Sequence, residues 1–500
     1  MENNQIKLRL SNEDIQIRIN ESAFDTQLLS VESEGLEMTL NFENPIKKIE
    51  CQAIVAKGHF MQSVLDYLEL PKTLESINGH SFPFPEAEKV KSNLLSSEGF
   101  FIKDKVLLGA IVPKSAIEIV VPDGIETIGP WAFPREAGDE KCVIILPKSV
   151  RRIEHDAFKE IDRKVKLPKD LEYIGDRAFY NPTPPSITIP DKVKYIGEFA
   201  FAESQRINSI KLGKGVETIE RGAFAEENLS SVKKISGPFA SEDERALVFK
   251  GILLRYATKD LNKQKGPFIV PDGVETIDTG SIVCTYMPPV YLPSTLKYIR
   301  EKGICNLTAS EYEIPESVVD IEEGAFYCCK IAKFKSKFAD KTGHLIVKDS
   351  VLITGSREIE ELVVPSSVTR IGKLAMSENT NLKAIKFHSG IKTIGDRAFV
   401  GCKRLSGALV LNQGLEEIGE WSFTFHKYSS ITIPSSIKSI GYKAFGDSYG
   451  SEIKDVYILS AHPFNWDMSG IPIEAEIHVP ESSIEAFKIS YPERADNIKS

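Results

Sequence analysis

Hydrophobic residues recur through most of this chain in one pattern of about fifteen positions. Residues 187–201 read ITIPDKVKYIGEFAF, and residues 431–445 read ITIPSSIKSIGYKAF. Both segments contain Ile-x-Ile-Pro, then an aliphatic residue, two variable residues, Ile-Gly and finally Ala-Phe. Repetition of a pattern this long predicts a repeat architecture in which each copy forms one structural unit.

Ten more segments follow the same template, and neighbouring copies lie 21 to 25 residues apart where the spacing is regular. Two gaps, between positions 213 and 271 and between 315 and 365, are each a little over two periods long. We expect one degenerate repeat and an insertion in each gap. The ten segments are VVPDGIETIGPWAF (120–133), ILPKSVRRIEHDAF (145–158), KLPKDLEYIGDRAF (166–179), KLGKGVETIERGAF (211–224), IVPDGVETIDTGSI (269–282), YLPSTLKYIREKGI (291–304), EIPESVVDIEEGAF (313–326), VVPSSVTRIGKLAM (363–376), KFHSGIKTIGDRAF (386–399) and VLNQGLEEIGEWSF (410–423).

A second, rarer segment precedes a regular repeat at three places by a similar distance. Its copies are FIKDKVLL (101–108), VFKGILL (248–254) and IVKDSVLI (346–353).

The first part of the template predicts a short strand. Side chains alternate along a strand, so Ile187 and Ile189 face the interior and Thr188 faces outward. Pro190 ends the strand because it has no N–H for a ladder.

The second part predicts a return to the core. We expect Gly197 to allow a tight bend and Ala200-Phe201 to form a short helical turn with the phenyl ring inside. One unit cannot bury its own apolar face, so stacked units must share a core. The expected fold is a β-rich α/β solenoid, a right-handed superhelix of short parallel strands and short helical turns.

Residues 1–97 lack the repeat and are expected to form a small α+β element, either a cap or a small domain. The segments 6–10, 15–19 and 36–42 alternate as half-exposed strands do. Residues 51–70 favour a helix, and the proline-bearing segment 81–88 favours a linker.

We place the repeat array at 98–476 and a C-terminal cap at 477–500. The cap begins as another repeat, and Ser482 or Ser483 is placed to start a short helix. Ile484, Phe487 and Tyr491 then share one helical face.

The template resembles the BspA-type leucine-rich repeats, which are marked by Ile-x-Ile-Pro, x-x-Val-x-x-Ile-Gly and Ala-Phe-x-x-Cys. The segments from Phe326 to Cys329 and from Phe399 to Cys402 keep even the final cysteine. The resemblance covers roughly residues 100 to 500. It implies a leucine-rich-repeat solenoid, and it implies attachment or host-protein binding at a cell surface, as for most members.

The outward residue of each first strand is the most informative candidate for function. These residues should form one ladder across the stacked strands, and half of them are apolar or aromatic, which favours a binding face. The candidate binding face comprises Val120, Ile145, Lys166, Thr188, Lys211, Ile269, Tyr291, Glu313, Val363, Lys386, Val410 and Thr432.

Composition narrows the partners. The formal net charge is -9 with no basic run, which disfavours nucleic acid. No apolar stretch reaches the length of a membrane span. The first ten residues alternate in polarity and lack the apolar core of a secretory signal, which favours the cytoplasm, whereas the family resemblance favours a cell surface.

No catalytic, cofactor or metal motif is recognisable in the chain, so we expect neither an enzyme nor a bound cofactor or metal. The eight histidines are dispersed, and none has metal-ligand spacing relative to a cysteine. Cys329 and Cys402 occupy a core position of the repeat, where a thiol packs like a hydrophobic side chain.

The sequence therefore favours a non-catalytic protein that recognises a partner protein, as an adhesin does. Two alternatives remain. One is a carbohydrate-binding protein that stacks sugars on Tyr291, Trp131, Trp421 or Trp466, and the other is a cytoplasmic scaffold.

Overall fold

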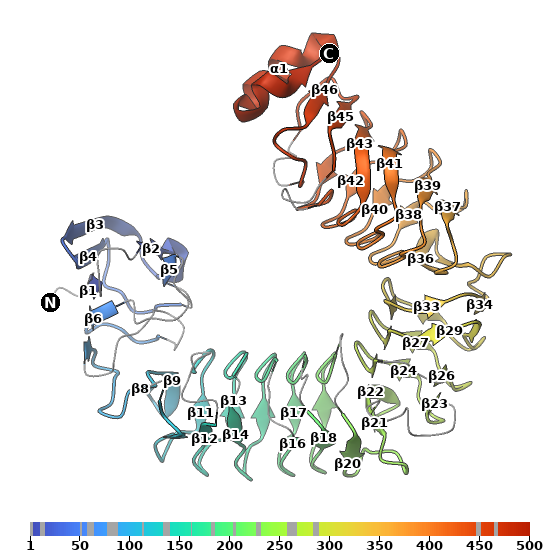
Figure 1. Ribbon diagram of the computed structural model, residues 1–500. Helices are drawn as coiled ribbons and strands as arrows, with labels where there is room; N and C mark the ends of the chain where they lie inside the picture. The colour runs from blue at the N-terminus through green and yellow to red at the C-terminus, as the bar shows by residue number, and fades with distance from the viewer. Residues whose placement is uncertain are drawn as a thin grey trace. The chain divides into compact units, whose positions relative to one another are not determined.

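The computed structural model describes most of the chain, and Figure 1 shows its strands stacked in successive coils. The described residues are 4–10, 16–50, 53–57, 65–77, 89–112, 115–133, 141–161, 163–181, 186–203, 207–226, 232–257, 268–283, 290–446, 452–464 and 469–500. The chain forms two compact units, residues 1–249 with 254–259, and residues 250–253 with 260–500.

The N-terminal residues form two sheets in which the strands pair antiparallel, except that β7 runs parallel to β6. One sheet has the order β3-β4-β1-β6-β7, and β2 pairs with β5. The elements are β1 (Gln5–Leu10), β2 (Gln16–Ile19), a 3-10 turn (Glu21–Ala23), β3 (Leu28–Glu34), β4 (Glu37–Phe42), β5 (Ile54–Lys57), β6 (Leu65–Glu69) and β7 (Val90–Lys91).

The three strands expected at 6–10, 15–19 and 36–42 are confirmed as β1, β2 and β4. The helix expected at 51–70 is wrong, because the described parts of that segment are the strands β5 and β6. Leu65 and Leu68 are buried in the core that β1 and β4 build, so tertiary pairing outweighed the local helical pattern. The expected linker at 81–88 lies outside the described residues.

Each repeat contributes a first strand that carries the Ile-x-Ile-Pro motif or its degenerate form. The first strands are β10 (Glu118–Val120), β12 (Val143–Ile145), β14 (Lys164–Lys166), β16 (Ser186–Thr188), β18 (Ser209–Lys211), β20 (Lys234–Ser236), β23 (Phe268–Ile269), β26 (Val290–Tyr291), β30 (Tyr312–Glu313), β34 (Phe334–Lys335), β37 (Glu361–Val363), β39 (Ala384–Lys386), β41 (Ser406–Val410), β43 (Lys427–Ile433), β45 (Asp455–Ile458), β46 (Glu476–His478) and β47 (Ile498–Lys499).

Each regular repeat also contributes a two-residue second strand just before its glycine position. These strands stack in parallel, as Ile153 beside Ile174 and Ile174 beside Ile196 show. The second strands are β11 (Thr127–Ile128), β13 (Arg152–Ile153), β15 (Tyr173–Ile174), β17 (Tyr195–Ile196), β19 (Thr218–Ile219), β24 (Thr276–Ile277), β27 (Tyr298–Ile299), β31 (Asp320–Ile321), β38 (Arg370–Ile371), β40 (Thr393–Ile394), β42 (Glu417–Ile418) and β44 (Ser439–Ile440).

Some coils add further short strands on a third side. These are β25 (Ile282–Val283), β28 (Ile304–Cys305), β29 (Thr308–Ala309), β32 (Phe326–Tyr327) and β33 (Lys330–Ile331).

Each copy of the rarer repeated segment contributes two neighbouring strands, which form a hairpin in the first and third copies. β8 (Phe100–Lys103) pairs antiparallel with β9 (Val106–Ala110), and β35 (Leu345–Lys348) pairs antiparallel with β36 (Val351–Gly355). In each hairpin, both residues of the tight turn have positive φ, which is the type I′ geometry that suits twisted strands. β21 (Ala246–Phe249) and β22 (Ile252–Tyr256) occupy the same place in the middle copy.

These hairpins each begin a new sheet of second strands. β9 pairs in parallel with β11, β22 with β24, and β36 with β38. The insertions expected in the two wide gaps therefore include β22 and β36, each of which is the strand on which the next series of second strands stacks. The expected degenerate repeats are also present, because β20 pairs with β18 and β34 pairs with β30.

The alternation within the first strand is confirmed. Ile187 and Ile189 are buried, and Thr188 is exposed. Phe201 is buried as expected, and its ring stacks between those of Phe179 and Phe224, with centroids 5.1 and 5.6 Å away. Similar stacks join Phe133, Phe158 and Phe179 in the first run of regular repeats and Phe399, Phe423 and Phe445 in the last, while Ile282 and Ile304 hold this position in the middle run.

The expected helical turn at Ala200-Phe201 is wrong, because the described residues there form hydrogen-bonded turns and not a helix. The fold is thus a β-solenoid of stacked parallel coils and not an α/β one. The bend is made by a residue with positive φ two positions before the Phe, such as Phe199 with φ of 52° or Arg397 with φ of 53°. A left-handed residue turns the backbone sharply without a helical hydrogen-bond ladder.

The role expected for Gly197 also needs correction. Its φ is not positive, and an added Cβ would lie 2.5 Å from the backbone nitrogen of Asp176 in the preceding coil. The glycine is required because successive coils approach closely there, and not because the chain bends at that residue.

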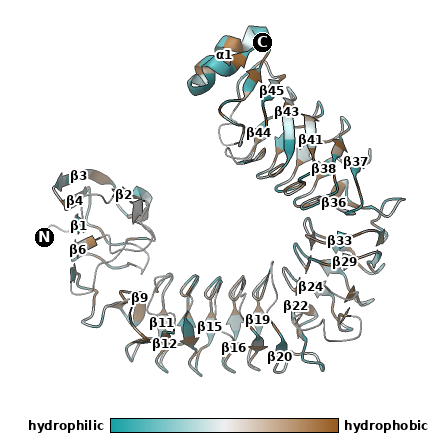
Figure 2. Ribbon diagram, in the orientation of Figure 1, coloured by the Kyte–Doolittle hydropathy of each residue, from teal (hydrophilic) through white to brown (hydrophobic). Residues whose placement is uncertain are grey.

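The C-terminal end forms as expected. β46 continues the parallel sheet of first strands, and the chain then forms a 3-10 turn (Glu481–Ser483), helix α1 (Ile484–Ser490) and a second 3-10 turn (Pro492–Asn497). Phe487 and Tyr491 are buried, and Ile484 packs against the same core. Figure 2 shows both hydrophobic and hydrophilic positions on α1, in keeping with a helix that covers a core on one side. The helix begins after Ser483, but this side chain makes no capping hydrogen bond.

Removing the ring of Phe201 should break the aromatic column. We expect Phe201→Ala to lower the free energy of unfolding by about 3–5 kcal/mol, because a packed aromatic site is emptied. The matched variant is Glu198→Ala in the same coil. Glu198 is exposed, and its hydrogen bonds to neighbouring coils use only its backbone. This variant should lower the free energy of unfolding by no more than about 0.5 kcal/mol. Denaturant unfolding curves measure both, and equal effects would contradict this orientation of the coil.

Candidate functional site

The predicted binding face lies on the outside of the first strands. Ten of its twelve residues are exposed, Ile145 and Thr432 are half-buried, and none is buried. The strands place many of these side chains opposite one another in register. The register pairs are Val120 with Ile145, Ile145 with Lys166, Thr188 with Lys211, Ile269 with Tyr291, Val363 with Lys386 and Val410 with Thr432.

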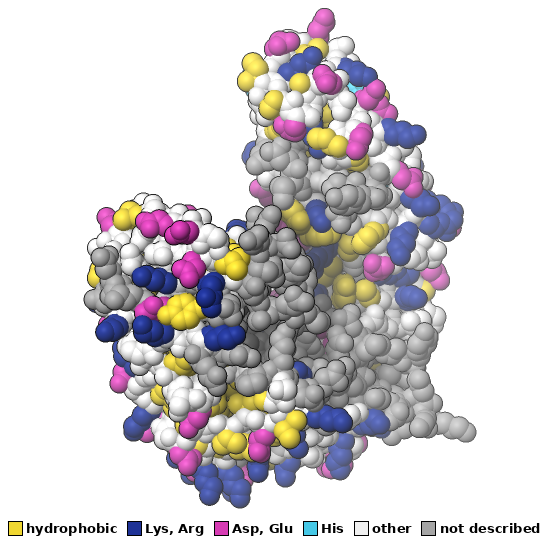
Figure 3. Space-filling model, turned by 60° about the vertical axis from the view of Figure 1, so that its left-hand side comes forward, with side chains coloured by type: hydrophobic (Ala, Val, Ile, Leu, Met, Phe, Trp, Pro, Cys, Tyr) yellow, Lys and Arg dark blue, Asp and Glu magenta, His cyan; other side chains and the backbone are white. Residues whose placement is uncertain are grey.

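The expected single ladder is divided into several short sheets. β10, β12 and β14 form one sheet, while β23 pairs with β26 and β37 pairs with β39. Charged members such as Lys166, Glu313 and Lys386 also separate the apolar ones. Figure 3 shows acidic and basic side chains intermingled over the visible surface.

Degenerate coils add members that the sequence template missed. Their register continues the face, with Ser236 beside Lys211, Lys335 beside Glu313 and Tyr457 beside Thr432. His478 and Lys499 extend it to the end of the chain. The alternating segments around these residues carry the strand signal, but they lack the Ile-Gly and Ala-Phe parts of the template.

The most exposed apolar pair on this face is Ile269 and Tyr291, with 62% and 55% of their surfaces accessible. The two residues are direct partners on the parallel strands β23 and β26, so their side chains adjoin. Val120, Val363 and Val410 are also more than half exposed. Adjoining exposed apolar groups favour association, because covering them removes apolar surface from water.

The second strands present another face, which the sequence interpretation passed over. The rings of Tyr173 and Tyr195 stack with centroids 4.9 Å apart, and the Arg152 guanidinium lies 3.9 Å from the centre of the Tyr173 ring. Burial and nearby carboxylates, Glu154 for Tyr173 and Glu220 for Tyr195, raise the pKa of both phenols. The signal was available, since the residue before each second-strand Ile must point outward.

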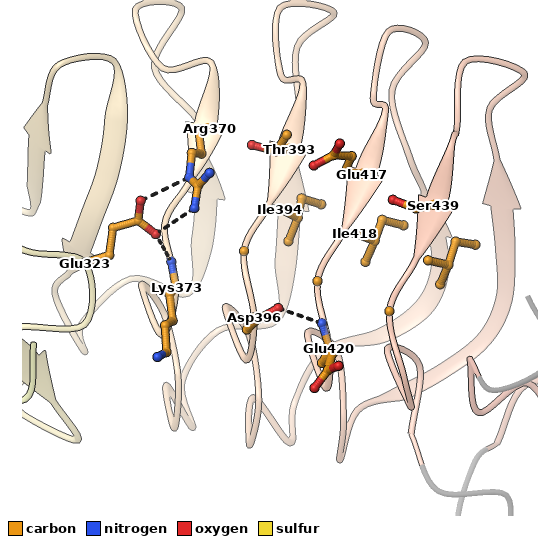
Figure 4. A pocket seen from close by; sticks show the side chains of 14 residues that line it. Glu323, Arg370, Lys373, Thr393, Ile394, Asp396, Glu417, Ile418, Glu420 and Ser439 are labelled. Carbon is orange, nitrogen blue, oxygen red and sulfur yellow. Dashed lines mark hydrogen bonds and ion pairs between the residues drawn. The ribbon is translucent and has the colours of Figure 1, made fainter. Parts of the chain in front are cut away.

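A groove crosses the second strands β38, β40, β42 and β44 (Figure 4). It has a volume of about 440 Å³ and is open to solvent. Its lining includes Gly395, Gly419 and Gly441. Polar groups line it, including Thr393 and Glu417.

One end of this groove is closed by an ion-pair network. Both carboxylate oxygens of Glu323 lie 3.1 Å from nitrogens of the Arg370 guanidinium (Figure 4). Oε2 also accepts a hydrogen bond of 2.7 Å from the Lys373 backbone N–H. The Lys373 ammonium pairs with Glu301 at 2.7 Å. The Glu323 carboxylate therefore serves to hold neighbouring coils together. Glu417 is a carboxylate that faces the open part of the groove.

Two of the tryptophans proposed for sugar stacking have a lysine over one face of the ring. The Lys159 ammonium lies 4.6 Å from the centre of the Trp131 ring, and the Lys443 ammonium lies 4.9 Å from that of Trp421. A sugar would have to displace these cations, so the geometry disfavours stacking there. Trp466 lies outside the described residues.

Cys329 and Cys402 are buried, as expected for core positions. The Cys402 thiol lies 3.1 Å from the Met376 carbonyl oxygen, and the Cys329 thiol lies 3.3 Å from that of Ile304. Burial raises the pKa of each to about 12. Both thiols are therefore protonated at neutral pH, which disfavours nucleophilic or metal chemistry. Cys328, which is only partly buried, also has a raised pKa because of burial.

One histidine belongs to the core. His426 donates from Nε2 to the Phe445 carbonyl oxygen at 3.1 Å, and its Nδ1 accepts the Tyr428 N–H at 2.9 Å. Acceptance at Nδ1 requires the neutral ring. Burial lowers the His426 pKa to about 4.

Another histidine lies in a cluster that short sequence motifs do not reveal. Ligand atoms of Asp455, Glu476 and His478 all lie within 4.8 Å of one another. The three come from neighbouring coils one repeat apart. Spacing rules that consider only nearby residues therefore overlook them.

The sequence model of the BspA type leucine-rich repeat region matches this chain in six copies, over residues 140–241, 264–341 and 352–462. These matches cover more than half of the chain, so the protein belongs to this family. No curated protein matches the chain.

The chain is also similar to several solved bacterial structures. A leucine-rich repeat protein from Bacteroides ovatus is 22% identical over 73% of this chain and 84% of its own, with a TM-score of 0.31. A leucine rich cell surface protein from Faecalibacterium prausnitzii is 18% identical over 73% and 93%, with a TM-score of 0.35. The pneumococcal vaccine antigen PcpA is 15% identical over 97% of both chains, with a TM-score of 0.31.

Within the described part of the chain, the structure contains no helix of the length and apolar character needed to cross a bilayer.

The buried His426 predicts a loss of stability on acidification. Its folded-state pKa of about 4 lies below the ordinary value, so between about pH 6.5 and pH 4 the unfolded chain binds a proton that the folded chain does not. Stability should therefore fall through this window, by about 2–3 kcal/mol from this group.

Unfolding free energies measured from pH 7 to pH 4 test this effect. His426→Gln should flatten the pH dependence, even if the variant is less stable throughout. His462→Gln, which changes an exposed ring, should leave the slope unchanged. An unaltered slope in His426→Gln would show that other groups cause the acid sensitivity.

Proposed function

We propose that this leucine-rich repeat protein is a non-catalytic recognition module that binds a partner protein along its first-strand face. The adjoining, exposed side chains of Ile269 and Tyr291 carry the proposal. Aromatic residues with apolar neighbours are typical of the few positions that supply most binding energy at protein interfaces.

The surroundings of this pair suit a protein partner. Charged residues such as Glu313 and Lys335, which are register partners on β30 and β34, follow at the next first strands. An apolar centre with a charged rim is the usual composition of such interfaces. Adhesion at a cell surface is one setting for this recognition, and a scaffold inside the cell is another.

Carbohydrate binding is the weaker alternative. Both described tryptophans have a ring face covered by a lysine, and Tyr291 is the single aromatic member of the twelve-residue face. Catalysis has less support still, because the Glu323 carboxylate at one end of the groove is occupied by structural bonds.

The double variant Tyr291→Ala with Ile269→Ser should weaken binding of a protein partner by at least about 2 kcal/mol, which is the loss typical of a central interface residue. The partner is first captured from bacterial and host lysates, with a glycan array run in parallel. Its affinity for each purified variant is then measured by calorimetry. The melting temperature should stay unchanged, since both side chains point away from the core.

The matched control is Tyr298→Ala with Ile489→Ser, which removes the same two residue types from exposed positions outside the first-strand face. This control should bind normally. If it loses binding while the Tyr291 variant keeps it, the second strands or the helical end carry the site. Specific capture on the glycan array without a protein partner would favour the carbohydrate alternative.

A further inference from the structure

The last coils bring one imidazole and two carboxylates together on the outside of the sheet. Asp455 on β45 and Glu476 on β46 are register partners, and His478 lies two residues after Glu476 on the same side of its strand. His478 Nε2 lies 3.2 Å from Asp455 Oδ1 and 4.0 Å from Glu476 Oε2.

The ring of His478 is held in place from two directions. It stacks on the Tyr457 ring with centroids 4.5 Å apart and an angle of 14° between the planes. Its Nδ1 lies 3.4 Å from the Ser500 main-chain oxygen, which can only accept a hydrogen bond. In the tautomer with its proton on Nδ1, the ring can donate to this oxygen. A histidine that ligates a metal is normally oriented in this way, with its other ring nitrogen donating to a main-chain oxygen.

This arrangement leaves an electrostatic problem at Nε2. In the neutral ring with its proton on Nδ1, Nε2 bears a lone pair, and that lone pair faces two carboxylate oxygens, which are also electron-rich. Either a proton or a metal cation at Nε2 resolves the repulsion. The three ligand atoms come from two directly paired strands and lie within 4.8 Å of one another.

The distances suit a small transition-metal ion. Bonds of about 2.0–2.2 Å to nitrogen and oxygen in tetrahedral geometry separate two ligand atoms by about 3.3 Å. The separations of 3.2 and 4.0 Å bracket this value. The Lys499 ammonium pairs with the other oxygen of Glu476, Oε1, at 2.5 Å, so Oε2 stays directed toward His478.

We propose that Asp455, Glu476 and His478 form a binding site for a divalent first-row transition metal ion, with Zn²⁺ as the representative. A single imidazole with two carboxylates suits such ions better than Ca²⁺, which takes six to eight oxygen ligands. The three residues leave at least one position of a tetrahedral ion for water or another ligand.

A metal here would join β45 to β46 next to the terminal strand β47. Coils near the end of a repeat array are supported by fewer neighbouring coils than those in the middle, so they unfold locally more readily. A cation that binds the folded coils and not the unfolded chain would stabilise this end.

Calorimetric titration of the metal-free full chain with Zn²⁺ near pH 7.5 tests the proposal. We expect saturable binding of one ion that requires His478, an affinity at least about tenfold lower in His478→Gln, and a comparable loss in Asp455→Asn. Affinity should also fall at pH 5.5, because an imidazole must be unprotonated to bind a metal. Amide hydrogen exchange should slow in residues 455–499 when Zn²⁺ is added.

The control is His462→Gln, which removes an exposed histidine outside the cluster and should bind Zn²⁺ as the unaltered chain does. Melting temperatures in the absence of metal establish that each variant is folded, and if His478→Gln is not, Asp455→Asn decides the question. Equal Zn²⁺ affinity in folded cluster variants and the unaltered chain, no saturable binding, or equally tight binding of Ca²⁺ would each overturn the proposal.

Discussion

Close contact between successive coils is the constraint on which the rest of this structure depends. At Gly197 and Gly419, a single added carbon would lie 2.4 to 2.5 Å from Asp176 or Asp396 in the preceding coil. These aspartates lie so close that each accepts the backbone N–H of the next coil, from Glu198 at 2.8 Å in one case and from Glu420 at 2.9 Å in the other. The acid and the glycine therefore act together, and both join one coil to the next.

This close stacking also explains how each coil turns. A helical turn would need more residues and a wider path, whereas one left-handed residue reverses the chain at once. Positions such as Arg397 and Phe199 accept that conformation although they carry side chains. The energetic cost of positive φ at these residues is offset because the turn aligns each core Phe with the next, and stacking of neighbouring rings buries a large apolar area.

Stacking determines the function-bearing surfaces as well. Residues one repeat apart in sequence become direct neighbours in space, so single outward side chains combine into pairs and rows. Ile269 meets Tyr291, Tyr173 meets Tyr195, and Asp455 meets Glu476 in this way. The proposed protein-binding face and the proposed metal site both arise from this pairing of residues one repeat apart. They depend on different residues, so disproving one would leave the other untouched.

The sequence by itself determined the solenoid, the inward position of residues such as Ile187 and the outward position of Tyr291, because these follow from a local period of apolar residues. It also predicted the end of the array, where Phe487 is buried. Only the tertiary structure decided that residues 54–57 and 65–69 are strands, because their partners lie far away in sequence. It alone divided the outer ladder into separate sheets and brought His478 to Asp455, since register between coils depends on the path of each coil and not on any short motif.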